Sequence, residues 1–219
     1  MKKLSRVLIT NWHYFSHEVF SLSDINFLTG KNASGKTTLI DAMQVIILGD
    51  TSGHFFNKSA QDKGSRSLKG YLKCEIGDND DGSIQYLRNG RFSSYVALEF
   101  FDDELNTSFT VGCVFDVFDD GSYDNHFFTI DEAIPENEFI VNNIPLSYKE
   151  LRIFLLENYV NVEFFETNTQ YREFIKIKFG NLNNNFFSLF KKAIPFSPIS
   201  NIEQFITEYV CHVKSSIDL

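Results

Sequence analysis

The sequence predicts a mixed α/β fold, and three observations lead to this prediction. A glycine-rich loop at residues 30–38 lies between a short strand pattern and a helix pattern. The part over residues 71–146 has strand composition broken by tight turns, which predicts antiparallel pairing. From residue 147 the spacing of capping and apolar residues predicts helices. We therefore expect a single unit with a loop-bearing core at 1–70, a β-rich part at 71–146 and a helical part at 147–219.

The loop-bearing core is expected to contain short strands and one long helix. Three segments have the apolar and β-branched composition of strands, namely residues 4–10, 19–22 and 25–29. The segment Lys36–Leu48 is apolar nearly all round, as a helix buried against a sheet should be. Gly49 supplies its C-terminal stop. The polar stretch over residues 50–70 is expected to be a loop.

The β-rich part is expected to be built from hairpins. Four segments have strand composition, namely residues 71–76, 92–101, 108–117 and 126–130. They are separated by stretches rich in Gly, Asp and Asn, which favour turns, namely residues 77–82, 102–106 and 119–122. A further hairpin is predicted to turn at Asn142 and Asn143.

The helical part carries two capping-box patterns. Ser147 and Ser200 are each followed three residues later by a glutamate, which predicts a helix start at both places. A third helix is predicted over about 169–179, where Gly180 would stop it. A fourth is predicted over about 185–193, ahead of two prolines.

The loop itself matches the phosphate-binding pattern G-x-x-x-x-G-K-[ST] without a mismatch. Glycines let the backbone turn tightly and approach a ligand, and the amides at the start of the helix then face anionic oxygens. Lys36 would reach the β- and γ-phosphates, and the Thr37 hydroxyl would bind Mg²⁺, a hard cation that takes oxygen ligands. The pattern predicts ATP and Mg²⁺ as cofactors. The residues expected to hold them are Gly30, Lys31, Asn32, Ala33, Ser34, Gly35, Lys36, Thr37 and Thr38.

Charge limits the kinds of partner the chain can have. Its formal net charge is −9, which argues against a general nucleic-acid coat protein but leaves room for a local basic patch. Basic residues are concentrated between residues 58 and 73, namely Lys58, Lys63, Arg66, Lys69 and Lys73. Such a run is either a solvated face or a contact for an anion. Both interpretations stay open at this point.

Cysteine usage and hydropathy indicate a cytoplasmic protein. Cys74, Cys113 and Cys211 are far apart, and no C-x-x-C occurs, so neither a zinc pattern nor a disulfide framework is predicted. Reduced thiols are the simplest account. No apolar run approaches the length of a membrane span, and no membrane partner is expected.

One element that a P-loop ATPase needs is not evident. Such an enzyme requires an acidic residue at the end of a hydrophobic strand, together with a group that orients the attacking water. Residues 111–116 form a hydrophobic run that ends in Asp116. We interpret this run as a surface hairpin strand, because it continues into an Asp-Asp-Gly turn. No Leu-Ser-Gly-Gly type signature loop occurs, so no catalytic residue is assigned.

Several stretches resemble the N-terminal lobe of SMC-like ATPase heads, a group that includes the SMC, RecF and MukB-like proteins. The segment Phe27–Ala42 carries the loop with Asn32 and the Asp41-Ala42 pair, although Ala33 replaces the usual glycine. The stretch 11–15 resembles the aromatic turn near the adenine, and 66–71 resembles the arginine-bearing loop. Two further stretches, 88–100 and 171–174, look most like the JetC family, the SMC subunit of Wadjet anti-plasmid systems.

The resemblance implies a P-loop NTPase of the ABC/SMC head type in which the head is split. The N-terminal lobe leads into a coiled coil near residues 200–219, and a C-terminal lobe returns with the acidic strand and the signature loop. It also implies a glutamine that touches Mg²⁺ or the water, for which Gln170 is the nearest candidate; an ordinary surface helix residue is the alternative. Lys63, Arg66 and Lys69 would contact DNA or a facing head.

The resemblance further implies how such a head works and with which partners. ATP would join two heads, and hydrolysis would release them and move DNA, in loop handling, plasmid defence or DNA repair. The implied partners are a second head, double-stranded DNA, and kleisin-like and accessory subunits. The lobe alone is not expected to turn over ATP. Two alternatives stay open: a self-contained P-loop switch without a coiled coil, and a non-catalytic module whose loop only holds phosphate.

Overall fold

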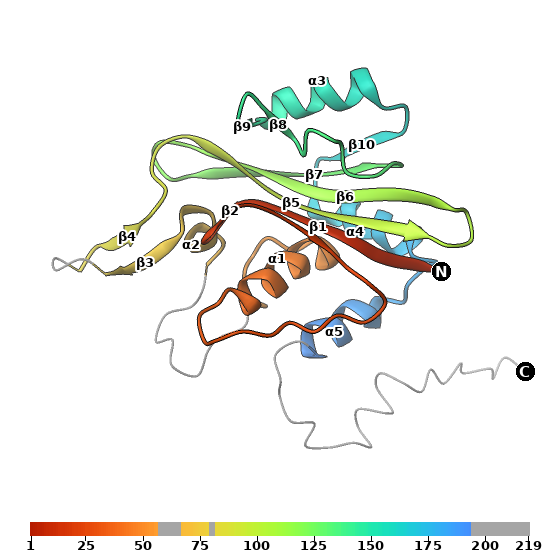
Figure 1. The fold of residues 1–219 in the computed structure, drawn as a ribbon, viewed down its shortest axis with the longest axis horizontal. Coiled ribbons are helices and arrows are strands. Elements are labelled where there is room, and N and C mark those ends of the chain that lie inside the picture. Colours follow the sequence, from red (N-terminus) through yellow and green to blue (C-terminus); the bar gives the residue numbers. More distant parts are fainter. Residues whose placement is uncertain (57–66, 79–81, 194–219) are drawn as a thin grey trace, which may run out of the picture.

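A six-stranded antiparallel sheet forms the centre of the molecule. The computed structural model describes residues 1–56, 67–78 and 82–193 (Figure 1). The strand order in the sheet is β10-β7-β6-β5-β1-β2. The bounds of these strands are β1 Lys2–Trp12, β2 Phe15–Ser21, β5 Phe92–Asp102, β6 Thr107–Val117, β7 Tyr123–Ile130 and β10 Val162–Phe165.

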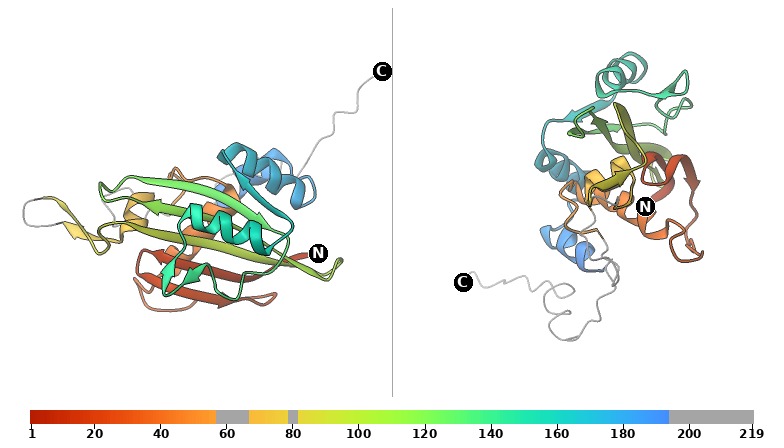
Figure 2. Two further views of the ribbon diagram at one scale, coloured as in Figure 1. Left: turned by 90° about the horizontal axis from the view of Figure 1, so that it is seen from above. Right: turned by 90° about the vertical axis from the view of Figure 1, so that its left-hand side faces the viewer.

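Helices cover both faces of this sheet and make a three-layer arrangement (Figure 2). On one face lie α1 (Lys36–Leu48), α2 (Leu68–Lys73), α4 (Asn168–Lys178) and α5 (Asn184–Ala193), all of which add side chains to one core. On the other lie α3 (Tyr148–Asn158) and the small hairpin of β8 (Ile140–Val141) and β9 (Ile144–Pro145). A second hairpin, β3 (Glu75–Asp78) and β4 (Ile84–Tyr86), projects from one end of the molecule (Figure 1).

The alternation of side chains along the strands explains why there are two cores. In β5, Val96 and Leu98 point into the core under α1, whereas Tyr95 and Ala97 point into the core under α3. This is the period of two that a strand imposes on its side chains. The central strands are therefore apolar on both faces, and α1 packs against one of these faces.

Most of the elements expected from the sequence are present. Helix α1 has the predicted bounds, and Gly49 ends it in the left-handed conformation with φ 55°. The capping box at Ser147 starts α3, and Asn142 and Asn143 turn the β8–β9 hairpin with φ 52° and 65°. The capping box expected at Ser200 lies outside the described residues.

Two expectations about secondary structure are wrong, and one strand of the sheet was not expected. Residues 25–29 form no strand, because they have no ladder partner in the described sheet, whose edge strand is β2. Residues 71–73 belong to helix α2, which Ser67 caps by accepting a hydrogen bond from the Gly70 N–H, so the strand begins only at Glu75. Strand β10 is not among the expected strands, since four residues are too few to show an alternation.

Strands β1 and β2 complete the same sheet as β5, β6 and β7, and β1 pairs directly with β5. The sheet thus draws strands from both the loop-bearing core and the β-rich part expected from the sequence. Among the described residues no helix is long and apolar enough to cross a membrane.

Candidate nucleotide-binding site

The phosphate loop is an exposed turn that runs into the first turn of α1. Gly30, Ala33 and Gly35 have φ angles of 155°, 63° and 88°. A Cβ on Gly30 would lie 2.6 Å from Ser34 Oγ, so the closed turn needs glycine at this position. The first amides of α1 have no partner within the helix, and they face the loop. The turn therefore presents N–H donors at the positive end of a helix dipole, which is the environment an anion requires.

Lys36 is folded back over this loop. Its Nζ donates hydrogen bonds to the carbonyl oxygens of Gly30 and Lys31, each at 2.8 Å, and to Ser34 Oγ at 3.3 Å. These partners are exposed main-chain and hydroxyl oxygens, and phosphate oxygens of higher charge can replace them. The ammonium group is thus already held at the loop where the β- and γ-phosphates would lie.

The residues of the loop fit a triphosphate with Mg²⁺. Thr37 is the second residue of α1 and is half-buried beside the loop. Within the described residues no group of three or more His, Cys, Asp or Glu side chains could hold a metal. By its place in the motif, the Thr37 hydroxyl is the oxygen that this loop would offer to Mg²⁺ bound with the phosphates.

Phe15 and Arg88 support the far side of the loop. A Cβ on Gly35 would lie 3.0 Å from the Phe15 Cζ atom, so the ring packs directly on the loop backbone. Arg88 holds the Phe15 main chain in place, because its guanidinium donates to the carbonyl oxygens of Phe15 at 3.0 Å and Leu72 at 3.3 Å. Partial burial lowers the pKa of Arg88 from its usual value, and the guanidinium stays charged.

An aromatic cluster packs against the first two turns of α1 from the side of the sheet. Trp12 Nε1 donates to the Thr38 carbonyl oxygen at 3.2 Å, and the indole stacks on the Tyr71 ring at 5.1 Å between centroids. The Tyr71 hydroxyl donates to the buried carboxylate of Asp41. This cluster fixes the direction in which the start of α1 points.

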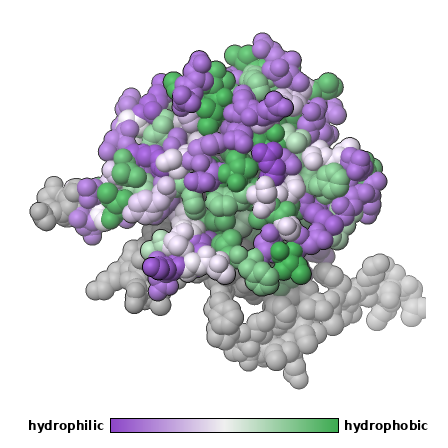
Figure 3. Space-filling view, viewed as in Figure 1, coloured by the Kyte–Doolittle hydropathy of each residue, from purple (hydrophilic) through white to green (hydrophobic). Residues whose placement is uncertain are grey.

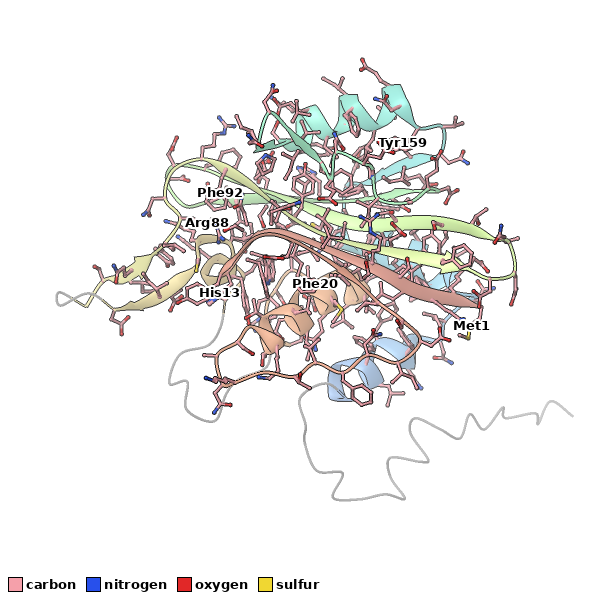
Figure 4. All side chains as sticks on the ribbon, viewed as in Figure 1. Met1, His13, Phe20, Arg88, Phe92 and Tyr159 are labelled. Carbon is pink, nitrogen blue, oxygen red and sulfur yellow. The ribbon has the colours of Figure 1, made fainter. Side chains whose placement is uncertain are left out.

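The turn between β1 and β2 is the aromatic turn expected near the base. Trp12 is fully buried and so cannot meet a ligand. His13 and Tyr14 lie at the turn, with their rings 4.5 Å apart, and the Tyr14 side chain is 63% exposed. Figure 4 labels His13 and Arg88, which lie at the same end of the sheet.

Among the described residues, the basic side chains at this end of the molecule differ in their ion pairing from those at the other end. Lys69 and Lys73 lie on α2, close to Gly121 in the β6–β7 turn. Neither they nor Arg88 and Arg91 pair with a carboxylate in the part of the chain that the structure describes. By contrast Lys2, Lys3 and Arg6 pair with carboxylates, namely Asp102, Asp24, Asp103, Glu99 and Glu138. Lys63 and Arg66 lie outside the described residues.

The structure does not bring Gln170 to the phosphate loop. Gln170 belongs to the first turn of α4, where its Oε1 accepts hydrogen bonds from the main-chain N–H groups of Glu166 and Thr167 at 3.2 Å and 3.1 Å. Its neighbour Tyr171 contacts Gly49 at the C-terminal end of α1. Because α1 has 13 residues, its two ends lie about 20 Å apart. The amide of Gln170 closes a helix cap, and in this structure it does not face Thr37.

Asp116 has a structural role, as the hairpin interpretation requires. It lies near the end of β6, which pairs antiparallel with both β5 and β7. Its carboxylate accepts hydrogen bonds from Ser93 Oγ at 2.7 Å and from the Tyr148 main-chain N–H at 3.0 Å. Asp116 thus caps the start of α3, on the face of the sheet opposite to the loop.

Sequence reasoning missed two contributions to the site. Arg88 stands out in the sequence only within a resemblance, because its carbonyl partners are main-chain atoms that no side-chain pattern reveals. Asp41 stands out as part of a motif, but its contact with Tyr71 joins residues 30 positions apart. The signal that could have found it is the position of Asp41, the carboxylate in a helix whose residues from 39 to 48 are mostly apolar.

Comparison with known families agrees with this geometry. Residues 4–63 match the family model described as the P-loop containing region of AAA domain. This range contains most of β1 and all of β2, the phosphate loop and α1. No curated protein matches the chain. The N-terminal part of the chain is therefore a P-loop nucleotide-binding region, which typically takes its nucleotide with Mg²⁺.

Proposed function

We propose that the chain is the ATP-binding half of an SMC-like, DNA-associated ATPase head of the ABC/SMC type, acting in the cytoplasm. The half-site binds ATP and Mg²⁺ through the loop, and a complementary lobe supplies the acidic strand and the signature loop. ATP then holds two such heads together. Kleisin-like and accessory subunits, and a role in plasmid defence, belong to the same proposal and rest on the sequence resemblance to the JetC family.

The position of the Lys36 ammonium group is the main support for the proposed binding of ATP. The ammonium reaches over a loop whose glycine conformations are those the motif needs, at the start of a buried helix. A loop that merely resembled the motif would have no reason to direct the lysine inward. Positioning and charge stabilisation are the chemistry this arrangement can supply.

The segment ahead of the loop supports the need for a complementary lobe. Ile25, Phe27 and Leu28 are large apolar residues at the surface, and Phe27 is 86% exposed. Apolar side chains also reach the surface along the lower edge of the molecule in Figure 3, where this segment passes in Figure 1. An added strand would cover these residues and give them ladder partners.

The proposed DNA contact is supported by the two lysines of α2. Lys69 is exposed, and Lys73 lies one turn further along the same helix, over the Tyr86 ring at 4.4 Å. Within the described residues neither lysine forms an ion pair, although Lys69 adds to the effect of Ser122 in lowering the pKa of Asp120. Both ammonium groups are therefore available to phosphates.

Calorimetry with ATP and Mg²⁺ tests the nucleotide site. We expect Lys36→Ala to weaken binding by at least about tenfold, because the variant has no ammonium group to make a charge-assisted hydrogen bond to the phosphates. Lys149→Ala removes an exposed lysine from α3 on the opposite face and should leave binding unchanged. Equal binding by Lys36→Ala and the unmodified chain would refute the site.

Titration with duplex DNA at several salt concentrations tests the α2 surface. The slope of the logarithm of the binding constant against the logarithm of the salt concentration is the quantity measured. Replacing Lys69 and Lys73 by alanine should make this slope less steep by about 0.9 for each phosphate that the variant no longer neutralises. The matched control replaces Lys149 and Arg152, two exposed cations of α3, by alanine. If both double variants bind DNA alike, or if the chain binds none, the chain is better described as a self-contained nucleotide switch.

A further inference from the structure

The start of α1 is held to α2 by a buried polar contact. Asp41 lies one turn beyond Thr37 on α1, and its side chain is fully buried. The Tyr71 hydroxyl of α2 donates to its Oδ2 atom. Burying a carboxylate is costly, and a hydrogen bond from a buried hydroxyl offsets that cost only in a defined geometry. The contact therefore fixes α2 and the start of α1 relative to each other.

The ring of Tyr71 is also linked to α1 through Trp12. It stacks on Trp12 with an interplanar angle of 8°, and the Trp12 indole N–H donates to the Thr38 carbonyl oxygen. The Tyr71 carbonyl oxygen in turn accepts the His13 N–H at 2.7 Å, at the β1–β2 turn. Tyr71 thus contacts the turn, the indole and α1 simultaneously.

We propose that Tyr71 and Asp41 are positioning residues of the phosphate loop, which set the direction of the first turns of α1. The inference rests on the proposed nucleotide binding. The amides at the start of α1 and the Thr37 hydroxyl serve the phosphates and Mg²⁺ only when the helix end points at the loop. The Tyr71–Asp41 contact is a buried polar constraint that connects this part of α1 to α2, which also carries Lys69 and Lys73.

The same helix provides a matched control at its other end. The Tyr171 hydroxyl is buried and donates to the Ile46 carbonyl oxygen at 2.9 Å, close to the C-terminal end of α1. Tyr71→Phe and Tyr171→Phe each remove one buried hydroxyl that is hydrogen-bonded to α1, and both keep the aromatic ring. A purely structural role predicts that both variants change thermal stability and nucleotide affinity in parallel.

The test is calorimetric titration of the 219-residue chain with ATP and Mg²⁺, with thermal unfolding measured on the same samples. We expect Tyr71→Phe to weaken ATP binding by up to about tenfold, because only the fraction of chains in which the start of α1 points at the loop can then bind the phosphates. Tyr171→Phe should leave ATP affinity unchanged although it lowers the unfolding temperature by a similar amount. Equal ATP affinity in the two variants would overturn the inference.

Variants at Asp41 provide a second readout. Asp41→Asn keeps an oxygen that accepts from the Tyr71 hydroxyl, whereas Asp41→Leu removes the acceptor. We expect Asp41→Asn to restore most of the affinity that Asp41→Leu loses, and equal losses would overturn the inference. If the unmodified chain binds no ATP, the proposed function fails as well. If it binds ATP and Tyr71→Phe binds as tightly, the inference alone fails.

Discussion

Ala33 shows how a single position can carry strain in the phosphate loop. It is a non-glycine residue with φ 63°, in the left-handed region where the Cβ lies too close to the next carbonyl oxygen. The similar loops of SMC-like heads usually have glycine at the equivalent position. Ala33 is exposed, so no packing compensates for the strain.

Replacing this alanine by glycine is expected to stabilise the chain. The substitution removes about 1–2 kcal/mol of backbone strain from the folded state. It also gives the unfolded chain more conformational freedom, which lowers stability by about 0.4–1 kcal/mol. We therefore expect the free energy of unfolding to rise by up to about 1.6 kcal/mol, as measured by urea titration. Ala42→Gly, at a buried interior position of α1, should instead lower it by about 1 kcal/mol or more. A decrease in both variants would contradict the strain argument.

At the scale of elements, α3 depends on contacts from outside its own helix. Ser147 and Glu150 form a capping box, and Asp116 of β6 accepts the Tyr148 N–H at 3.0 Å. Hydrogen bonds from the Ser147 hydroxyl and main-chain N–H lower the pKa of Glu150. Next to this cap the His126 ring of β7 stacks on Tyr148, with 3.6 Å between ring centroids. The stability of the contact between β7 and α3 therefore depends on the charges of these side chains.

The stability of this contact is expected to fall in mild acid because of His126. Partial burial lowers the His126 pKa below 6.5, and this outweighs the opposing effect of Asp124 and Asp116. The unfolded chain therefore takes up the proton first as the pH falls. The stabilisation from neutral His126 is complete above pH 6.5 and is lost as the pH falls from there through the folded-state pKa.

Unfolding titrations at about pH 7.5 and about pH 5.5 check this prediction. The free energy of unfolding should be lower at the acid pH, and His126→Gln should show a smaller difference between the two conditions. The same difference in the variant and the unmodified chain would assign the pH dependence to other groups.

At the scale of the whole molecule, local patterns were predictable and long-range pairings were not. The bounds of α1, the start of α3 and the turn at Asn142 follow from short-range rules of capping and turn chemistry. The pairing of β1 with β5 joins residues more than 80 positions apart. Nothing in either segment alone specifies that partner.

The candidate site likewise has residues that were predictable from the sequence and residues that were not. The glycines, Lys36 and Thr37 were predictable because the motif is contiguous. The support comes from three separate parts of the chain, namely Trp12 of β1, Tyr71 of α2 and Arg88 of the loop between β4 and β5. The resemblance suggests Gln170 as a group near the metal, whereas the T-x-x-Q spacing from Thr167 is a capping box that the structure uses.

The described part of the chain places no acidic strand beside the loop, and we therefore expect it to bind ATP without ordinary turnover. Phosphate release should stay well below about 1 s⁻¹, a rate typical of slow enzymes. Asp116→Asn should alter the stability of α3 and not the rate of phosphate release, because Asp116 caps that helix. Turnover at or above this rate that disappeared in Asp116→Asn would make β6 a catalytic strand.

The chain contains one tryptophan, and that residue is Trp12. Its indole is fully buried between Tyr71 and α1, with its N–H on the Thr38 carbonyl oxygen. Indole emission depends on such hydrogen bonds and on neighbouring rings, so the tryptophan emission of the protein reports on the carbonyl group of the residue that follows the expected Mg²⁺ ligand Thr37. The molecule thus has a built-in optical probe, whose emission should change when ATP and Mg²⁺ are added and should stay constant in Lys36→Ala.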